Sequence, residues 1–149
     1  MEKKDRLEKL IGKTVMVPQF LTTDPANHRG DIGTVTAVHS YKDGYADISV
    51  SFKDGCGRYD AFALLILFPK KIILQSLINK FDSIDKETRK DMLQVVKLIC
   101  QKRPERALSL AMENKDLESS CVTNCQDWIE IKKKQALKTA RRLSGNKKS

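Results

Sequence analysis

The sequence predicts an α+β protein in which a small five-stranded β-barrel is followed by a helical C-terminal region of three to four helices. Two observations predict this class. Short runs of β-branched residues, separated by glycine-containing turns, fill residues 13–68, and the spacing of apolar residues changes to a helical period after Pro69. A chain of 149 residues is long enough to bury a core without disulfides.

The barrel region contains five short segments with strand character. The third of them alternates apolar and polar side chains, which is typical of a half-buried strand. Asp-Gly pairs at positions 43–44 and 54–55 favour tight hairpin turns, because Gly adopts the positive φ that such turns need. Five short strands predict a closed barrel, which leaves no sheet edge exposed. The segments are residues 14–17, 32–39, 45–52, 58–62 and 64–68.

A glycine and valine pattern in this region resembles a known family. The segment from Gly30 to Val38 follows G-x-x-G-x-V-x-x-V, and Gly12-Lys-Thr-Val15 precedes it. It resembles the core of KOW-type SH3-like barrels, and also small SH3-like domains of unassigned function, over residues 10–69. KOW domains are associated with RNA, ribosomes and transcription complexes, so the resemblance implies an SH3-like barrel with a nucleic-acid or nucleoprotein partner. The loop at residues 18–29 is longer than the KOW pattern has, and such a loop can bind a partner.

Beyond Pro69, apolar residues recur at intervals of three and four, which predicts amphipathic helices around residues 74–81 and 92–100. Pro104 suits the first position of a third helix, and Asn124 suits the cap of a final helix with Asp127 in its first turn. These helices must bury their apolar faces against one another or against the barrel. The predicted organisation is an SH3-like barrel at residues 1–69, a helical domain at 70–143 and a disordered basic tail at 144–149.

Positive charge is concentrated at the end of the chain. The 28 Lys and Arg residues exceed the 19 Asp and Glu residues, which gives a net charge of +9. Residues 130–149 hold 8 basic and 1 acidic side chains, so they carry +7 of this excess. A partner rich in phosphate groups is therefore expected to contact the C-terminal end.

The basic residues of this end lie on a predicted amphipathic helix, with small residues such as Ala136 and Ala140 on the opposite side. The cations are expected to contact phosphate, and nucleic acid is favoured over an anionic membrane surface as its source. The simpler interpretation is a helix docked through its small residues, with solvated cations. The candidate phosphate-binding residues are Lys132, Lys133, Lys134, Lys138, Arg141 and Arg142.

Three tyrosines and three further basic residues lie near the predicted barrel turns or in the long loop. Tyrosine rings can stack on nucleic-acid bases while the cations contact phosphates. The alternative is that the tyrosines only rim the barrel, with the ring buried and the hydroxyl in water. These residues are Tyr41, Tyr45, Tyr59, Arg29, Lys42 and Arg58.

No arrangement of residues in the sequence predicts catalysis, a cofactor or a metal site. The four cysteines lack the paired spacing of a zinc site, so free thiols are expected. Cys56, which lies between turn glycines, leaves thiol chemistry with His28 or His39 as a minor alternative. We therefore expect a protein that is not an enzyme.

The leading hypothesis is a non-catalytic protein that binds the phosphate backbone of DNA or RNA through its basic C-terminal helix, with the barrel as an auxiliary surface. The alternative is a protein-interaction or assembly module that docks through the barrel and the 18–29 loop. No apolar run approaches the roughly 20 residues of a membrane span, and the first residues are charged. These features predict a soluble cytoplasmic protein without an export signal.

Overall fold

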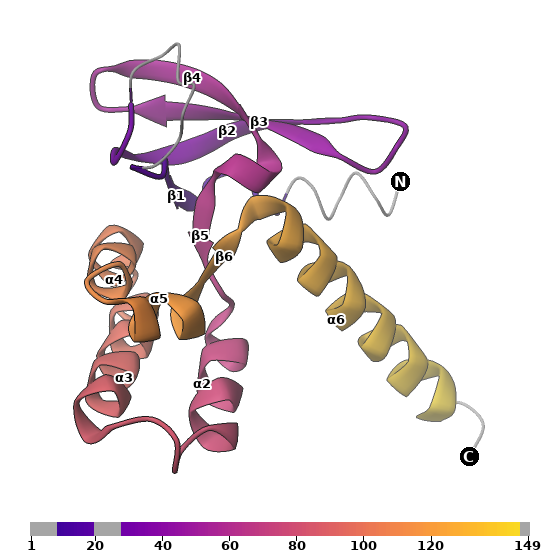
Figure 1. Cartoon of the computed structure of the whole chain (residues 1–149). Coiled ribbons are helices and arrows are strands. Elements are labelled where there is room, and N and C mark those ends of the chain that lie inside the picture. Colours follow the sequence, from indigo (N-terminus) through magenta and orange to yellow (C-terminus); the bar gives the residue numbers. More distant parts are fainter. Residues whose placement is uncertain (1–8, 20–27, 147–149) are drawn as a thin grey trace.

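A computed structural model describes residues 9–19 and 28–146, without the side chains of residues 143–146 (Figure 1). The described chain is α+β, with the helices below and beside a twisted sheet. In chain order the elements are β1 (Thr14–Met16), β2 (Ile32–Ser40), β3 (Ala46–Phe52), β4 (Gly55–Asp60), the 3-10 helix η1 (Ala61–Ala63), β5 (Leu65–Leu67), α2 (Lys70–Asn79), α3 (Lys86–Cys100), α4 (Pro104–Ala111), α5 (Lys115–Cys121), β6 (Val122–Asn124) and α6 (Cys125–Asn146).

The strands form one open antiparallel sheet in the order β4-β3-β2-β1-β5-β6. The predicted closed five-stranded SH3-like barrel is therefore wrong: within the described residues, no ladder joins the outer strands β4 and β6. The reason is β6, which comes from the C-terminal half of the chain and pairs with β5 at the edge where a barrel would close.

The predicted separation of strands and helices is also wrong. The 3-10 helix η1 lies between β4 and β5, and β6 lies between α5 and α6. The described chain has five α-helices where three to four were expected, and α5 is the one that was missed. Its segment reads as a turn, but the Oδ1 atom of Asn114 accepts a hydrogen bond from the Leu117 amide at 2.8 Å and starts the helix. Leu117 is fully buried and holds α5 in place.

The predicted alternation of β3 is confirmed. Ala46, Ile48, Val50 and Phe52 are all buried, while the residues between them are half-buried or exposed. The turn before β3 contains Gly44 with a φ of +89°, as the Asp-Gly pattern predicts.

The buried apolar residues form two clusters. The first lies under the sheet and joins residues such as Val15, Ile48 and Leu64 to Trp128 of α6. The second lies among α2, α3, α4 and α5 and includes Ile73 and Met92. The first cluster thus contains residues from both predicted domains, 1–69 and 70–143. The domain division itself stays a prediction.

The last helix runs to Asn146, into the stretch 144–149 that was predicted to be a disordered tail. Residues 147–149 lie outside the described residues.

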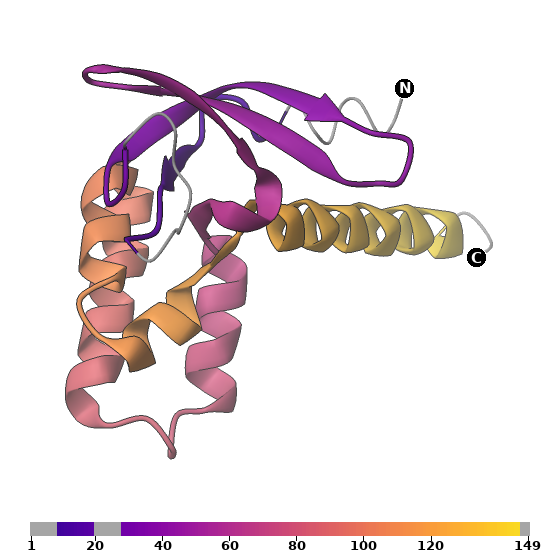
Figure 2. The same cartoon turned by 45° about the horizontal axis from the view of Figure 1, so that its top comes forward.

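The helices point in two directions from the sheet. Figure 2 shows α2 and α3 side by side below it, whereas α6 leaves at a wide angle and carries its C-terminal half away from the body. The start of α6 is in the first cluster, where Cys125, Trp128 and Ile129 are buried. In the part of the chain that the structure describes, no helix is both long enough and apolar enough to span a bilayer.

Substitution of Gly33 by alanine is expected to destabilise the sheet. A Cβ atom at this buried position would lie 2.5 Å from Val50 Cγ1 and 2.7 Å from the carbonyl oxygen of Ser51. Because overpacking of this kind costs about 1–3 kcal/mol, Gly33→Ala should lower the melting temperature by several degrees in a thermal unfolding experiment. Thr34→Ala, at the next and exposed position of β2, is the control and should change stability by less than about 0.5 kcal/mol. Equal losses in the two variants would contradict the close approach of β3 to Gly33.

Candidate functional site

The last helix begins in the protein interior and ends on the surface. Its predicted cap is confirmed: Asn124 Oδ1 accepts a hydrogen bond from the Asp127 amide at 2.8 Å. Asn124 Nδ2 also donates to Asp127 Oδ2 at 3.1 Å, which ties the first turn together. Trp128 is only 3% exposed, whereas every residue from 137 to 142 is exposed. The buried first turns thus anchor a helix whose second half is free to contact a partner.

The exposure of the basic residues of α6 also increases toward the C-terminal end of the helix. Lys132 and Lys133 are half-buried, and the Lys132 Nζ atom lies 5.4 Å from the centre of the Trp128 ring. The other predicted cations, Lys134, Lys138, Arg141 and Arg142, are exposed. Within the described residues, the ion pairs are those of His28 with Asp31 and Arg58 with Asp47, so no carboxylate neutralises α6 there.

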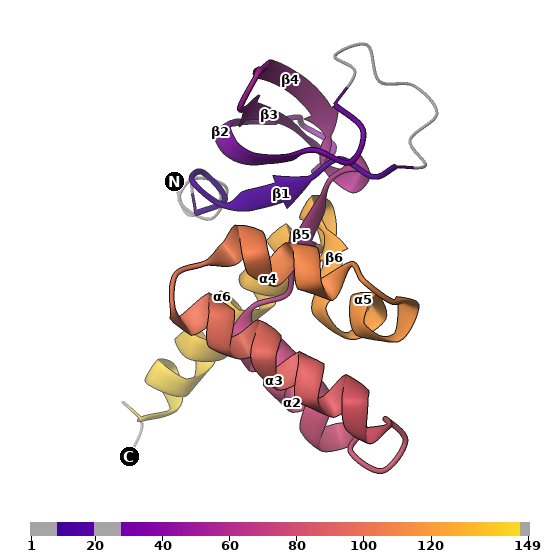
Figure 3. The ribbon, with the colours of Figure 1, turned by 90° about the vertical axis from the view of Figure 1, so that its left-hand side faces the viewer.

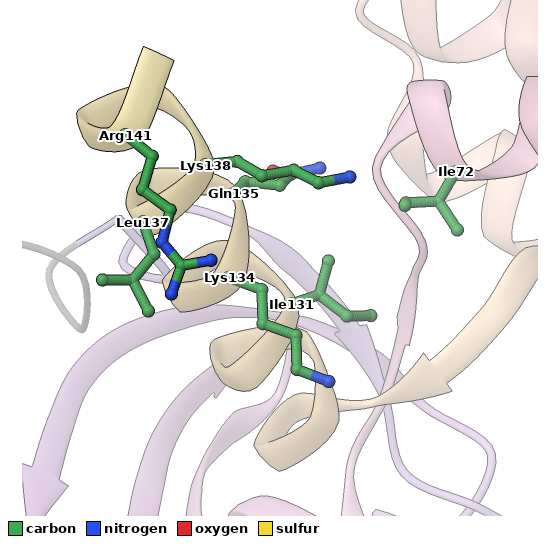
Figure 4. Close-up of a pocket in the computed structure, with 7 residues that line it drawn as sticks. All are labelled: Ile72, Ile131, Lys134, Gln135, Leu137, Lys138 and Arg141. Atoms are coloured by element: carbon green, nitrogen blue, oxygen red, sulfur yellow. The ribbon is translucent and has the colours of Figure 1, made fainter. Parts of the chain in front are cut away.

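A pocket of about 470 Å³ lies between α2 and α6 (Figure 4). Its apolar part consists of Ile72 from α2 and Ile131 and Leu137 from α6, and Figure 4 shows Lys138 and Gln135 extending from α6 toward Ile72. Its charged lining consists of Lys134, Lys138 and Arg141, and no acidic residue lines it.

The sequence prediction found the cations of this pocket but missed its apolar residues. Leu137 is 48% exposed and lies beside the basic residues of α6. From the sequence, only the small residues on the other side of the helix were considered as an apolar surface. Ile72 could not be assigned to this site from the sequence, because its proximity to α6 depends on the tertiary fold.

The predicted residues at the β2–β3 turn form a separate group. The Tyr41 hydroxyl donates to Asp47 Oδ2 at 2.6 Å, and Arg58 Nη2 donates to the Tyr41 oxygen at 3.1 Å. The hydrogen bond to Asp47 raises the pKa of Tyr41. Because Arg58 also forms an ion pair with Asp47, at 3.4 Å, its charge is partly balanced. Lys42 is exposed in the same turn.

The three predicted tyrosines have different environments. Tyr41 and Tyr45 are 49% and 51% exposed, and the Tyr45 ring lies 5.7 Å from the ring of Phe62, which is itself exposed. Tyr59 is only 6% exposed, because its ring packs edge-on against Phe52 at 6.2 Å. Its ring is therefore not accessible for base stacking.

The structure brings the turn group near the beginning of α6 but not near its basic end. The Gln126 Nε2 atom, in the first turn of α6, donates to the carbonyl oxygen of Gly44 at 3.1 Å. Arg29 is exposed and precedes β2, so it lies at the opposite end of this strand from the β2–β3 turn, next to residues 20–27 of the long loop, which lie outside the described residues. The predicted candidates therefore form two groups, one on α6 and one at the β2–β3 turn, with Arg29 apart from the second.

The cysteines divide into exposed and buried pairs. Cys56 and Cys100 are exposed free thiols, whereas Cys121 and Cys125 are buried. Burial raises the pKa of both Cys121 and Cys125 to about 12. In the described ranges, 9–19 and 28–146, no group of three or more His, Cys, Asp or Glu residues is placed to hold a metal ion.

Alkylation should therefore distinguish the two pairs. At neutral pH, a pKa near 12 reduces the reactive thiolate fraction about a thousandfold, and burial also blocks access. We expect iodoacetamide to label Cys56 and Cys100 in the native protein and all four cysteines in denaturant, as measured by peptide mass spectrometry. Rapid labelling of Cys121 without denaturant would contradict the buried environment. A Cys56 rate above that of a model thiol would support the minor alternative of thiol chemistry.

Comparisons with protein-family models, with curated proteins and with solved structures found no match to this chain. The KOW-type resemblance therefore stays a prediction, and function must be argued from the residues of the site.

Proposed function

We propose that this protein is a non-catalytic, cytoplasmic nucleic-acid-binding protein whose α6 contacts the phosphate backbone. The observation that carries this proposal is the basic pocket between α2 and α6, which Lys134, Lys138 and Arg141 line without any acidic residue. Phosphate groups provide the negative charge that such a surface lacks, and they are the main source of protein affinity for nucleic acids.

The spacing of the cations supports contact with several phosphates. Lys134 and Arg141 are separated by seven positions of a helix, or about 10 Å along its axis. This length matches about three nucleotide steps of 3.4 Å along one strand. Along the axis, Lys138 lies about 6 Å from Lys134 and about 4.5 Å from Arg141, and both distances are shorter than the Debye length of about 8 Å at physiological salt, so neighbouring charges act together on a polyanion.

The helix bears an energetic cost for this arrangement. Like charges four residues apart, such as Lys134 and Lys138, destabilise a helix by about 0.2–0.5 kcal/mol, whereas a mixed-charge surface would stabilise it. If the charges of this helix served only solubility, they would not all need to be positive. This cost favours phosphate binding over the simpler interpretation of a docked helix with solvated cations.

The turn group provides an auxiliary surface in this proposal. The exposed rings of Tyr41, Tyr45 and Phe62 can stack on unpaired bases, with Lys42 beside them. The alternative of a protein-docking module rests on the 18–29 loop. Most of that loop lies outside the described residues, and no contact of the described residues favours this alternative.

Removal of the α6 cations should weaken binding and reduce its dependence on salt. We expect the logarithm of the binding constant to fall with the logarithm of salt concentration by about 0.9 per phosphate for duplex DNA and about 0.7 for single strands. The triple variant Lys134→Gln, Lys138→Gln, Arg141→Gln should flatten this slope by about 2 to 3, because about three phosphate contacts are lost. Fluorescence anisotropy with labelled duplex and single-stranded oligonucleotides measures both quantities.

Two further variants complete the test. Lys86→Gln, Lys90→Gln, Lys115→Gln removes the same charge from exposed positions of α3 and α5 and should leave the slope nearly unchanged. A chain that ends at Glu130 keeps Trp128 and Ile129 for the first cluster and should bind no better than the α6 triple variant. Equal slopes for the native chain and the α6 triple variant would rule out the proposed role of α6. A partner that survives nuclease and high salt, and is lost when the 18–29 loop is shortened, would favour the docking module.

A further inference from the structure

A second pocket lies where β1, the connection from β5 to α2, and α6 meet. Its volume is about 380 Å³, and its apolar lining includes Ile66, Phe68 and Trp128. Ile99 from the last turn of α3 and Pro104, the first residue of α4, complete this wall on either side of the α3–α4 connection. In Figure 3, this connection, the start of β1 and α6 lie on the same side of the molecule. The pocket is thus built from parts of the chain that are far apart in sequence.

Four lysines line this pocket, and no acidic residue does. Lys13 precedes β1, Lys70 and Lys71 begin α2, and Lys132 belongs to α6. The first three are exposed and can turn toward a ligand, whereas Lys132 is half-buried with its ammonium group near the Trp128 ring. Three of the four, Lys13, Lys70 and Lys71, lie in segments with little net charge, so composition alone did not identify them.

The folded chain brings these cations together at an electrostatic cost. Burial, followed by the positive charges of Lys13 and Lys9, lowers the pKa of Lys132. Because this pKa is lower in the folded chain than in the unfolded chain, protonation of Lys132 opposes folding at neutral pH. The first turn of α2 also contains two lysines and no acidic residue, although a helix dipole favours negative charge there. An anion in the pocket would relieve this repulsion.

We propose that this pocket binds a phosphomonoester group carried by an organic body, such as the phosphate of a nucleotide. Such a group has a charge of about −1.5 to −2 at neutral pH and three acceptor oxygens, which match a set of ammonium donors better than a single carboxylate does. The apolar wall around Trp128 fits the organic body. The ligand is either a small phosphorylated compound or the phosphorylated end of a nucleic-acid strand. This site differs from the proposed backbone contacts, because three of its four lysines, Lys13, Lys70 and Lys71, lie outside α6 and none of Lys134, Lys138 and Arg141 lines it.

Thermal unfolding of the full chain tests this proposal. At a concentration ten times its dissociation constant, inorganic phosphate or a nucleoside 5′-monophosphate should raise the melting temperature by about 3–6 °C over chloride of equal ionic strength. Lys132→Met keeps the aliphatic stem beside Trp128 and should remove most of this rise. In phosphate-free buffer, the same variant should melt at the same or a higher temperature, because it removes the repulsion.

Two double variants control for folding and for general charge effects. Lys70→Gln, Lys71→Gln changes only exposed residues of the pocket and should also remove most of the rise, whereas Lys86→Gln, Lys90→Gln should retain it. The proposal is overturned if phosphate gives no rise beyond that of chloride, or if all variants retain the same rise.

The two sources of the phosphate group are distinguished by oligonucleotide binding. If a strand end is the ligand, a 5′-phosphorylated oligonucleotide should bind several-fold more tightly than its 5′-hydroxyl form, and Lys132→Met should abolish the difference. If the two forms bind equally while the monophosphate still raises the melting temperature, the ligand is a small phosphorylated compound. The variant Lys134→Gln, Lys138→Gln, Arg141→Gln should keep the phosphate-dependent rise, so failure of the α6 proposal and failure of this one give different results.

Discussion

The three-residue ladder between β5 and β6 determines where every candidate residue of α6 lies. Leu67 pairs with Val122 and Leu65 pairs with Asn124, and the Cys125 amide extends the ladder by donating to the Leu64 carbonyl oxygen at 3.0 Å. The ladder is about 10 Å long, and two turns of α6 advance by nearly the same distance. Because the strands are antiparallel, α6 starts at the end of the ladder away from α2, and its first turns pass β5 before the helix diverges from the body. Lys132 therefore lines the same pocket as the first turn of α2, and the pocket between α2 and α6 follows further along the helix.

The same ladder lies at the boundary between the two buried clusters. Cys121 and Val122 belong to the helical cluster, whereas Cys125 and Trp128 belong to the cluster beneath the sheet. A change in the pairing of β5 with β6 would therefore disturb both clusters at once. The apolar wall of the lysine-lined pocket belongs to both clusters, with Ile66 and Trp128 in the first and Phe68 packed against the second, while its lysines are mostly at the surface. A mostly apolar wall with a few polar or charged groups is a common arrangement for a binding site.

The sequence predicted local features well and long-range features poorly. The alternation of β3 and the cap at Asn124 depend on neighbouring residues, and both were found. Closure of the sheet depends on which strand occupies the free edge of β5, and β6 is too short to stand out from a turn-rich stretch. The candidate site residues show the same contrast between local and long-range features. The α6 cations lie close together in the sequence, between residues 132 and 142, and were found, whereas Lys13 and Lys71 join them only through the tertiary fold. Tyr59 was predicted to stack on bases, because its burial against Phe52, which is in another strand, does not follow from neighbouring residues.

The position of Trp128 has a practical consequence. The chain contains one tryptophan, and this residue is 3% exposed, lies in the wall of the lysine-lined pocket and has the Lys132 ammonium group beside its ring. Its indole emission is sensitive to a nearby charge, so any ligand that draws Lys132 toward itself changes the fluorescence of the whole protein. The fluorescence of Trp128 can therefore report ligand binding in this pocket, between the sheet and the start of α2, without an added label.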